Sequence, residues 1–136
     1  MYKNFKYSEI TPKGWIARQL KIQAEGLAGN LDNMWPDVQN SAWIGGDKEG
    51  WERVPYWLDG FVPLAYLLRD KGMIARAQKY LRAIMDRQQP DGWICPARRK
   101  NARTTICGRC SLYARCLRNT EFTPKTTALW NARIRR

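Results

Sequence analysis

Apolar residues recur every three to four positions in three stretches of the first 96 residues, which is the spacing of helices that bury one face. The first stretch carries on a single face Ile16, Leu20, Ala24 and Leu27. Thr11 and Pro12 come before this face, in the order that favours an N-cap followed by the first helical position. Gly26 and Gly29 follow it and supply the expected exits. We therefore predict a first helix that begins at Thr11-Pro12.

The second and third stretches predict an antiparallel pair of helices. From Pro55 to Asp70 the apolar stripe consists of Leu58, Phe61, Ala65 and Leu68, and up to Gln88 or Gln89 it consists of Ile74, Ala77, Leu81, Ile84 and Met85. The short segment Asp70-Lys71-Gly72 between them is typical of an αα-hairpin. Pro63 cannot donate to the carbonyl of Asp59, so this helix either starts late or kinks beside Gly60.

Periodicity is lost from Asn30 to Gly50, which predicts a long loop. Trp35 and Trp43 lie in it, and they either line a ligand site or plug the loop onto the helices. The tight turn Gln89-Pro90-Asp91-Gly92 ends the third helix, and Trp93-Ile94 begins to pack again.

The window from Trp51 to Gly60 holds the candidate binding residues. Aromatic faces next to carboxylates suit a sugar-binding cleft, and the candidates are Trp51, Glu52, Tyr56, Trp57 and Asp59. An equally acceptable interpretation is a helix entry packed on its neighbour. Glu49, Glu52 and Asp59 could supply a carboxylate pair, but surface or capping carboxylates are the favoured interpretation. The chain has no histidine, so we assign no catalytic residue and no imidazole base.

These motifs, taken in order, carry a family resemblance. They are Ser41-Ala42-Trp43-Ile44-Gly45-Gly46-Asp47, Gly50-Trp51-Glu52-Arg53, Pro55-Tyr56-Trp57-Leu58-Asp59-Gly60, Pro63-Leu64-Ala65-Tyr66-Leu67-Leu68 and Gln88-Gln89-Pro90-Asp91-Gly92-Trp93. Most of residues 8–94 resembles the amino-terminal region of the β-L-arabinofuranosidase-like glycoside hydrolases of family 127. The resemblance implies an all-α fold, as a fragment of an (α/α)6 toroid of helical hairpins, and a carbohydrate substrate for the intact enzyme.

The same resemblance implies that this chain alone is inactive. Enzymes of the family use a cysteine nucleophile on a zinc site and a glutamate acid/base, all much further along the chain than residue 96. We therefore expect neither a catalytic residue nor a metal or other cofactor in this fragment, although the full-length family uses zinc. With two or three helices, Leu64, Leu67, Leu81 and Ile84 should lack partners, which predicts marginal stability and aggregation.

Charge divides the chain near residue 96. The 136 residues carry a formal charge of +12, but residues 1–96 have 13 Lys/Arg against 11 Asp/Glu, whereas residues 97–136 have 11 against the single Glu121. No stretch suits a membrane span and the start lacks a signal peptide's apolar run, so we expect a cytoplasmic protein without a membrane partner. We assign residues 1–96 to the hydrolase and residues 97–136 to a separate basic tail.

Three interpretations of the tail stay open. Cys95, Cys107, Cys110 and Cys116 suggest a zinc site, but a single close pair is a weak signal. The basic residues suggest a small nucleic-acid-binding module. We do not expect nucleic acid to be a partner of this chain. The third interpretation is a frameshift: read from the third base of each codon, Thr104–Ser111 permits the sequence YDMWALF, which is typical of the helix that the family carries there. We expect residues 97–136 to be out of frame and not folded.

Overall fold

The computed structural model describes residues 5–90 and 93–96. In these ranges the chain is all-α, as predicted, with no strand and one isolated bridge between Ser41 and Lys48. The elements are, in order, the 3-10 helix η1 (Tyr7–Glu9), α1 (Gly14–Glu25), α2 (Leu27–Met34), α3 (Pro36–Gln39), the 3-10 helix η2 (Ala42–Ile44), α4 (Arg53–Leu68) and α5 (Lys71–Asp86). The predictions for residues 97–136, including Cys107, Cys110 and Cys116, lie outside the described residues.

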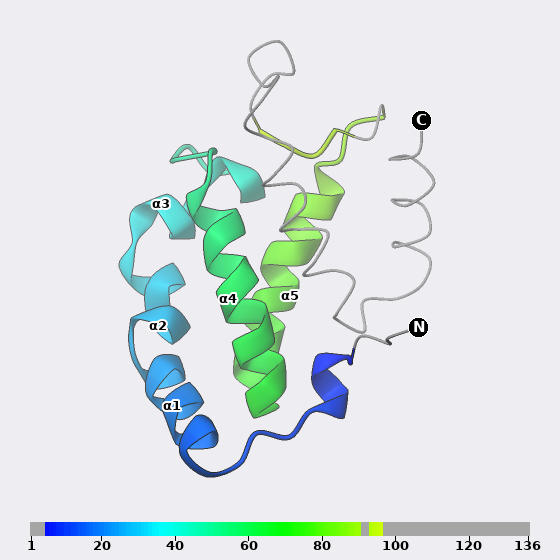
Figure 1. The fold of residues 1–136 in the computed structure, drawn as a ribbon. Coiled ribbons are helices and arrows are strands. Elements are labelled where there is room, and N and C mark those ends of the chain that lie inside the picture. The colour runs from blue at the N-terminus through cyan, green and yellow to red at the C-terminus, as the bar shows by residue number, and fades with distance from the viewer. Residues whose placement is uncertain (1–4, 91–92, 97–136) are drawn as a thin grey trace.

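Helices α4 and α5 form the predicted antiparallel hairpin, and α1 to α3 lie along one side of it (Figure 1). Arg69 adopts a left-handed conformation with φ of 56° and ends α4. The Asp70 carboxylate accepts the backbone N–H of Met73 at 2.8 Å and caps α5. The hairpin turn is therefore tighter than predicted, because Lys71 and Gly72 already belong to α5. Helix α4 begins at Arg53 and runs through Pro63, so the late start is wrong.

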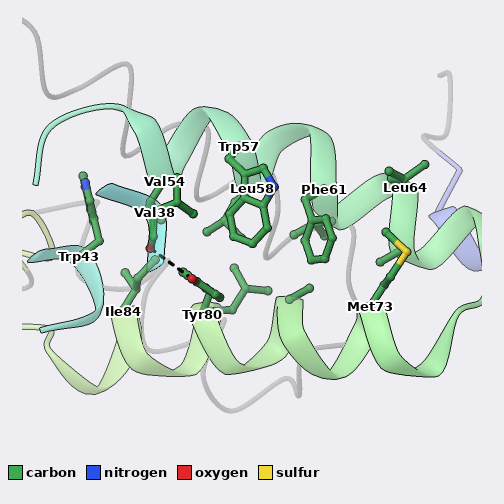
Figure 2. Close-up of a cluster of buried hydrophobic side chains, with 14 of the residues drawn as sticks. Val38, Trp43, Val54, Trp57, Leu58, Phe61, Leu64, Met73, Tyr80 and Ile84 are labelled. Atoms are coloured by element: carbon green, nitrogen blue, oxygen red, sulfur yellow. Dashed lines mark hydrogen bonds between the residues drawn. The ribbon is translucent and has the colours of Figure 1, made fainter. Parts of the chain in front are cut away.

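The core is centred on the interface between α4 and α5, and Val38 and Trp43 extend it (Figure 2). Trp57 stacks on Phe61 with ring centroids 4.5 Å apart and meets the edge of Tyr80 at 4.9 Å. Leu64, Leu81 and Ile84 are all buried. The prediction that these side chains lack partners is therefore wrong for these three, because the two helices of the hairpin cover each other; Leu67, the fourth residue of that prediction, is half-buried.

The start of α1 also differs from the prediction. Lys13 precedes the helix, which begins at Gly14 with φ of 59°, a conformation that glycine adopts without strain. Pro12 therefore lies before the helix, and the Thr11 hydroxyl accepts a hydrogen bond from the Arg69 guanidinium at 3.1 Å instead of capping α1. Gly26 ends α1 as predicted.

Helix α1 buries no residue. Trp15 is 73% exposed and Ile22 is 56% exposed. They are seven positions apart and so share one face of the helix. The half-buried residues Ala17, Leu20 and Ala24 lie on the opposite face. Among the described residues, the outer side of α1 therefore exposes apolar surface, and so do Leu27 and Met34 of α2 and Tyr56 of α4.

The segment predicted as a long loop is mostly short helices. Gly29 lies inside α2, and a Cβ there would come within 1.8 Å of the Ala24 carbonyl oxygen, so glycine permits the close approach of α1 and α2. The Asn30 amide donates to the carbonyls of Glu25 at 3.0 Å and Gly26 at 2.9 Å and so caps the end of α1. Helices this short show no clear period in sequence, which explains the error.

The final described residues return to the core, as predicted. The backbone N–H of Gln89 donates to the Trp93 carbonyl at 2.8 Å, and Ile94 and Cys95 are buried in the hydrophobic cluster. In the ranges that the structure describes, no helix combines the length and the apolar character needed to cross a bilayer.

Candidate functional site

The candidate window begins at a firmly fixed helix start. The Glu49 carboxylate accepts the backbone N–H groups of Trp51 at 2.7 Å, Glu52 at 3.0 Å and Arg53 at 3.3 Å. These are N–H groups that a helix start leaves without an internal partner. Glu49 is therefore a capping carboxylate, which is the interpretation that the sequence favoured for it.

The loop before the window is held by its own hydrogen bonds. The Ser41 hydroxyl donates to the Glu49 carbonyl at 2.6 Å and accepts from the Trp43 backbone N–H at 3.3 Å. Trp43 is buried, and its indole N–H donates to the Trp51 carbonyl at 3.3 Å. Trp43 thus plugs the loop onto the hairpin, and the position of Trp51 depends on it.

The structure separates the five candidate residues into two groups. Trp57 is only 7% exposed, and its indole N–H donates to the Ala28 carbonyl on α2 at 3.0 Å. One ring face stacks on Phe61. Trp51 is half-buried and packs against the same core. These two tryptophans are packing residues in this structure, and Trp57 offers no open face for a sugar ring.

Glu52, Tyr56 and Asp59 point the other way. They follow one another by four and three positions, so they form one line along α4, which we call the outward stripe. Tyr56 is 59% exposed, Glu52 is exposed and Asp59 is half-buried. Gly60 comes next, and a Cβ built there would meet no atom within 4 Å. The outward stripe therefore presents two carboxylates and a phenol beside open space.

A cation and an aromatic ring lie at the start of α4. The Arg53 guanidinium is 4.6 Å from the ring centroid of Trp35 and forms an ion pair with Asp37. Trp35 remains partly exposed, in contrast to Trp43. The sequence analysis placed Trp35 in a loop and did not pair it with Arg53, because a contact between residues 18 positions apart leaves no local pattern.

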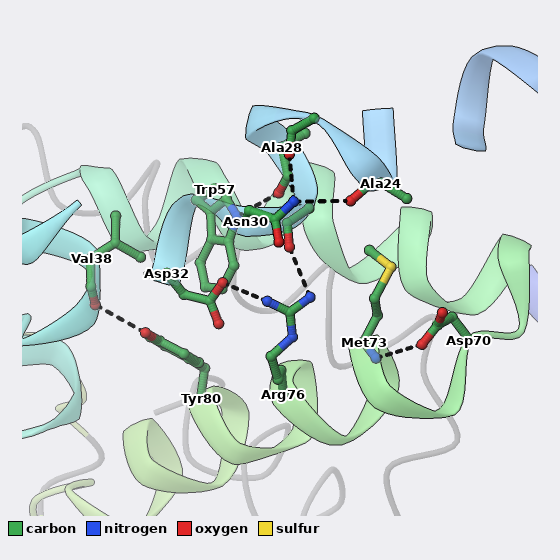
Figure 3. Close-up of polar contacts among 12 residues, drawn as sticks. Ala24, Ala28, Asn30, Asp32, Val38, Trp57, Asp70, Met73, Arg76 and Tyr80 are labelled. Carbon is green, nitrogen blue, oxygen red and sulfur yellow. Dashed lines mark hydrogen bonds and ion pairs between the residues drawn. The ribbon is translucent and has the colours of Figure 1, made fainter. Parts of the chain in front are cut away.

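A second polar cluster lies between α2 and α5 (Figure 3). Arg76 donates to the Asp32 carboxylate at 2.8 Å and to the Gly29 carbonyl at 2.8 Å. Asp32 is buried, and the guanidinium also lies 5.1 Å from the centre of the Phe61 ring. The arrangement joins α2 to the hairpin, because a buried carboxylate needs its charged partner.

Tyr80 lies beside this cluster. Its hydroxyl donates to the Val38 carbonyl at 3.2 Å. The pKa of Tyr80 is raised from 10.0 to about 12, first by burial and then by the Asp32 carboxylate, while Arg76 acts in the opposite direction. The sequence analysis missed the whole cluster, since Asp32 lay in the presumed loop and Arg76 in an ordinary helical pattern.

The described residues offer no metal site. In residues 5–90 and 93–96 no three His, Cys, Asp or Glu side chains come together as ligands would need to. No protein-family model matches the chain, and no curated protein or solved structure is significantly similar to it. The family resemblance consequently rests on the quoted motifs alone.

Proposed function

We propose that most of residues 8–94 forms the amino-terminal helical part of a glycoside hydrolase that resembles the β-L-arabinofuranosidases of family 127. The outward stripe would contact the sugar, and the chain alone would be inactive. The supporting observation is the split of the window from Trp51 to Gly60 around α4: its tryptophans pack inward, while Glu52, Tyr56 and Asp59 lie outside the core. Packing in the hydrophobic core therefore accounts for the tryptophans of this window and not for the outward stripe.

The chemistry of the outward stripe suits sugar hydroxyls. Carboxylates accept hydrogen bonds from hydroxyl groups, and a tyrosine adds an apolar face with a polar tip. Because α4 is capped by Glu49 and held by Trp57, these side chains stand on a fixed helix. Trp51 and Trp57 contribute by positioning α4 and not by contacting the sugar.

A sugar titration of the 136-residue chain tests the binding part of the proposal. Methyl β-L-arabinofuranoside should shift the amide NMR signals of α4 around Tyr56, with a dissociation constant on the order of millimolar for so open a site. Tyr56→Ala should abolish these shifts. Trp15→Ala removes another exposed aromatic outside the motif and should preserve them. Equal loss in both variants, or no shift in the wild-type chain, would contradict sugar binding by the outward stripe.

The enzyme part of the proposal requires the gene. Sequencing through the codons for Cys95 to Arg136 and several hundred bases beyond should reveal a one- or two-base change that restores a long helical frame. The restored protein should hydrolyse a chromogenic β-L-arabinofuranoside, and the 136-residue chain should not. Hydrolysis by the short chain would refute the proposed inactivity, and a confirmed frame without a helical continuation would refute the hydrolase assignment.

The basic tail supports a second candidate, a nucleic-acid-binding module. The specific observation is the net charge of +10 carried by residues 97–136. Retention on immobilised single-stranded DNA that falls steeply with salt, and that is lost when residues 97–136 are deleted, would favour this function over the hydrolase. We expect the deletion to leave the sugar titration unchanged.

A further inference from the structure

A cavity of about 770 Å³ lies between the second half of α1 and the turn that joins α4 to α5. Its apolar wall comes from three helices, through Ala24 of α1, Leu68 of α4 and Met73 of α5. It lies at the opposite end of α4 from the outward stripe. A cavity of this size is within the range that holds small-molecule ligands.

The rim of the cavity is charged and has an excess of cations. Lys21, Arg69 and Arg76 line it on the positive side, and Glu25 and Asp70 line it on the negative side. Figure 3 shows Asp70 at the start of α5, Arg76 within α5, and Ala24 on the facing element. That facing element is α1, which also carries Lys21 and Glu25. The charges therefore come from both sides of the cavity.

Existing contacts leave Lys21 and Arg69 without an ion-pair partner among the described residues, whereas Asp32 already balances the charge of Arg76. The Asp70 carboxylate already accepts the Met73 backbone N–H at 2.8 Å. Among the described residues, the Arg69 guanidinium donates to a neutral hydroxyl, that of Thr11. Lys21 forms no ion pair with any residue that the structure describes. Arg76 is held in place by Asp32, so its position is fixed before any ligand arrives.

We propose that this cavity binds a small organic anion, namely a carboxylate or phosphate group carried on a short apolar body. The anionic group would lie near Lys21 and Arg69, because charge-assisted hydrogen bonds to oxygen anions are the strong contacts available there. The apolar body would cover Leu68 and Met73. This site is independent of the proposed sugar contact, since the two share no residue.

Titration of the full chain with hexanoate tests the proposal. Hexylammonium and 1-hexanol are the controls, because they carry the same six-carbon chain without a negative charge. Hexanoate should shift the amide signals of residues around the cavity saturably below about 10 mM, and the other two probes should not. Lys21→Gln should weaken hexanoate binding by about threefold, as expected for an exposed charge. Lys79→Gln removes the same charge from α5 outside the cavity and should change nothing.

A second variant, Gly72→Glu, tests the proposal even if Lys21→Gln weakens hexanoate binding only slightly. Gly72 lines the cavity in the first turn of α5, where a carboxylate suits the helix. A Cβ there approaches only the Asp70 carboxylate, at 3.3 Å. Gly72→Glu should fold with unchanged circular dichroism and abolish hexanoate binding. Hexanoate binding that survives in Gly72→Glu, or hexylammonium binding as tight as hexanoate binding, would overturn the proposal.

Discussion

Helices α5 and α1 are both amphipathic in sequence, yet only α5 has fully buried residues in the structure. Helix α5 buries Met73, Ala77, Tyr80, Leu81 and Ile84 against α4. Helix α1 buries no residue, and its largest apolar side chain, Trp15, faces away from the hairpin. The difference shows that an apolar period predicts a helix, but its burial depends on whether the fold supplies a partner for that face.

Helix α1 contacts α4 directly, and α2 joins the two regions further by a few polar contacts. The Trp57 indole donates to Ala28, and Arg76 bonds to Asp32 and Gly29. Hydrogen bonds that cross from one packed unit to another contribute about 1 kcal/mol each when neutral and more when charged. The hairpin should therefore be the more stable unit, and α1 should be the part that opens first.

The sharpest test of this comparison uses one residue type in both regions. Ile84 is 1% exposed on α5, and Ile22 is 56% exposed on α1. Ile84→Ala should lower the free energy of unfolding by about 2–5 kcal/mol, through lost burial and a cavity. Ile22→Ala should change it by less than roughly 0.5 kcal/mol. Urea denaturation followed by circular dichroism measures both.

Similar losses in the two isoleucine variants would break the comparison. They would mean that another surface covers the outer face of α1 in solution. A protein concentration series would then identify self-association, since burial in a second copy makes the transition depend on concentration.

The ion pair that joins α2 to the hairpin gives the next largest effect. Arg76→Met keeps an apolar stem over Phe61 but leaves the buried Asp32 carboxylate without its cation. We expect a loss of about 2 kcal/mol, because an unpaired buried charge is costly. In an Asp32→Asn background the same change should cost about 1 kcal/mol less. Strictly additive losses in this double-mutant cycle would show that the pair does not couple α2 to α5.

The sequence was sufficient to predict those elements whose defining pattern lies within a short stretch of the chain. The apolar stripes of α4 and α5 lie within single helices, so the hairpin followed from their period and from the short turn near Asp70. The hydrogen-bonding preferences of short side chains were less decisive. Thr11 is a good N-cap in principle, but Arg69 binds its hydroxyl across the fold and Gly14 starts the helix instead.

The candidate site shows the same limit. The helical spacing of Glu52, Tyr56 and Asp59 was visible in the sequence, but the direction in which that line faces depends on the partner that packs against α4. Trp57 illustrates this point, because its neighbour Ala28 is 29 positions away. Asp32 and Arg76 are separated by 44 positions, so no local pattern could predict their contact.

The smallest predicted effect concerns Tyr80, which lies where the ion pair meets the hairpin core. Its pKa is about 12 in the folded chain and 10.0 is its usual value, so between these pH values the unfolded chain loses the phenol proton while the folded chain keeps it. The stabilising contribution is thus complete below pH 10 and is lost as the pH rises towards 12, by about 1 kcal/mol at pH 11. Between pH 9 and pH 11 the urea midpoint should fall more for the wild-type chain than for Tyr80→Phe, because the phenylalanine has no proton to lose. An equal fall in both would show that the alkaline loss comes from other groups, and that the buried end of α5 is more open to water than the structure indicates.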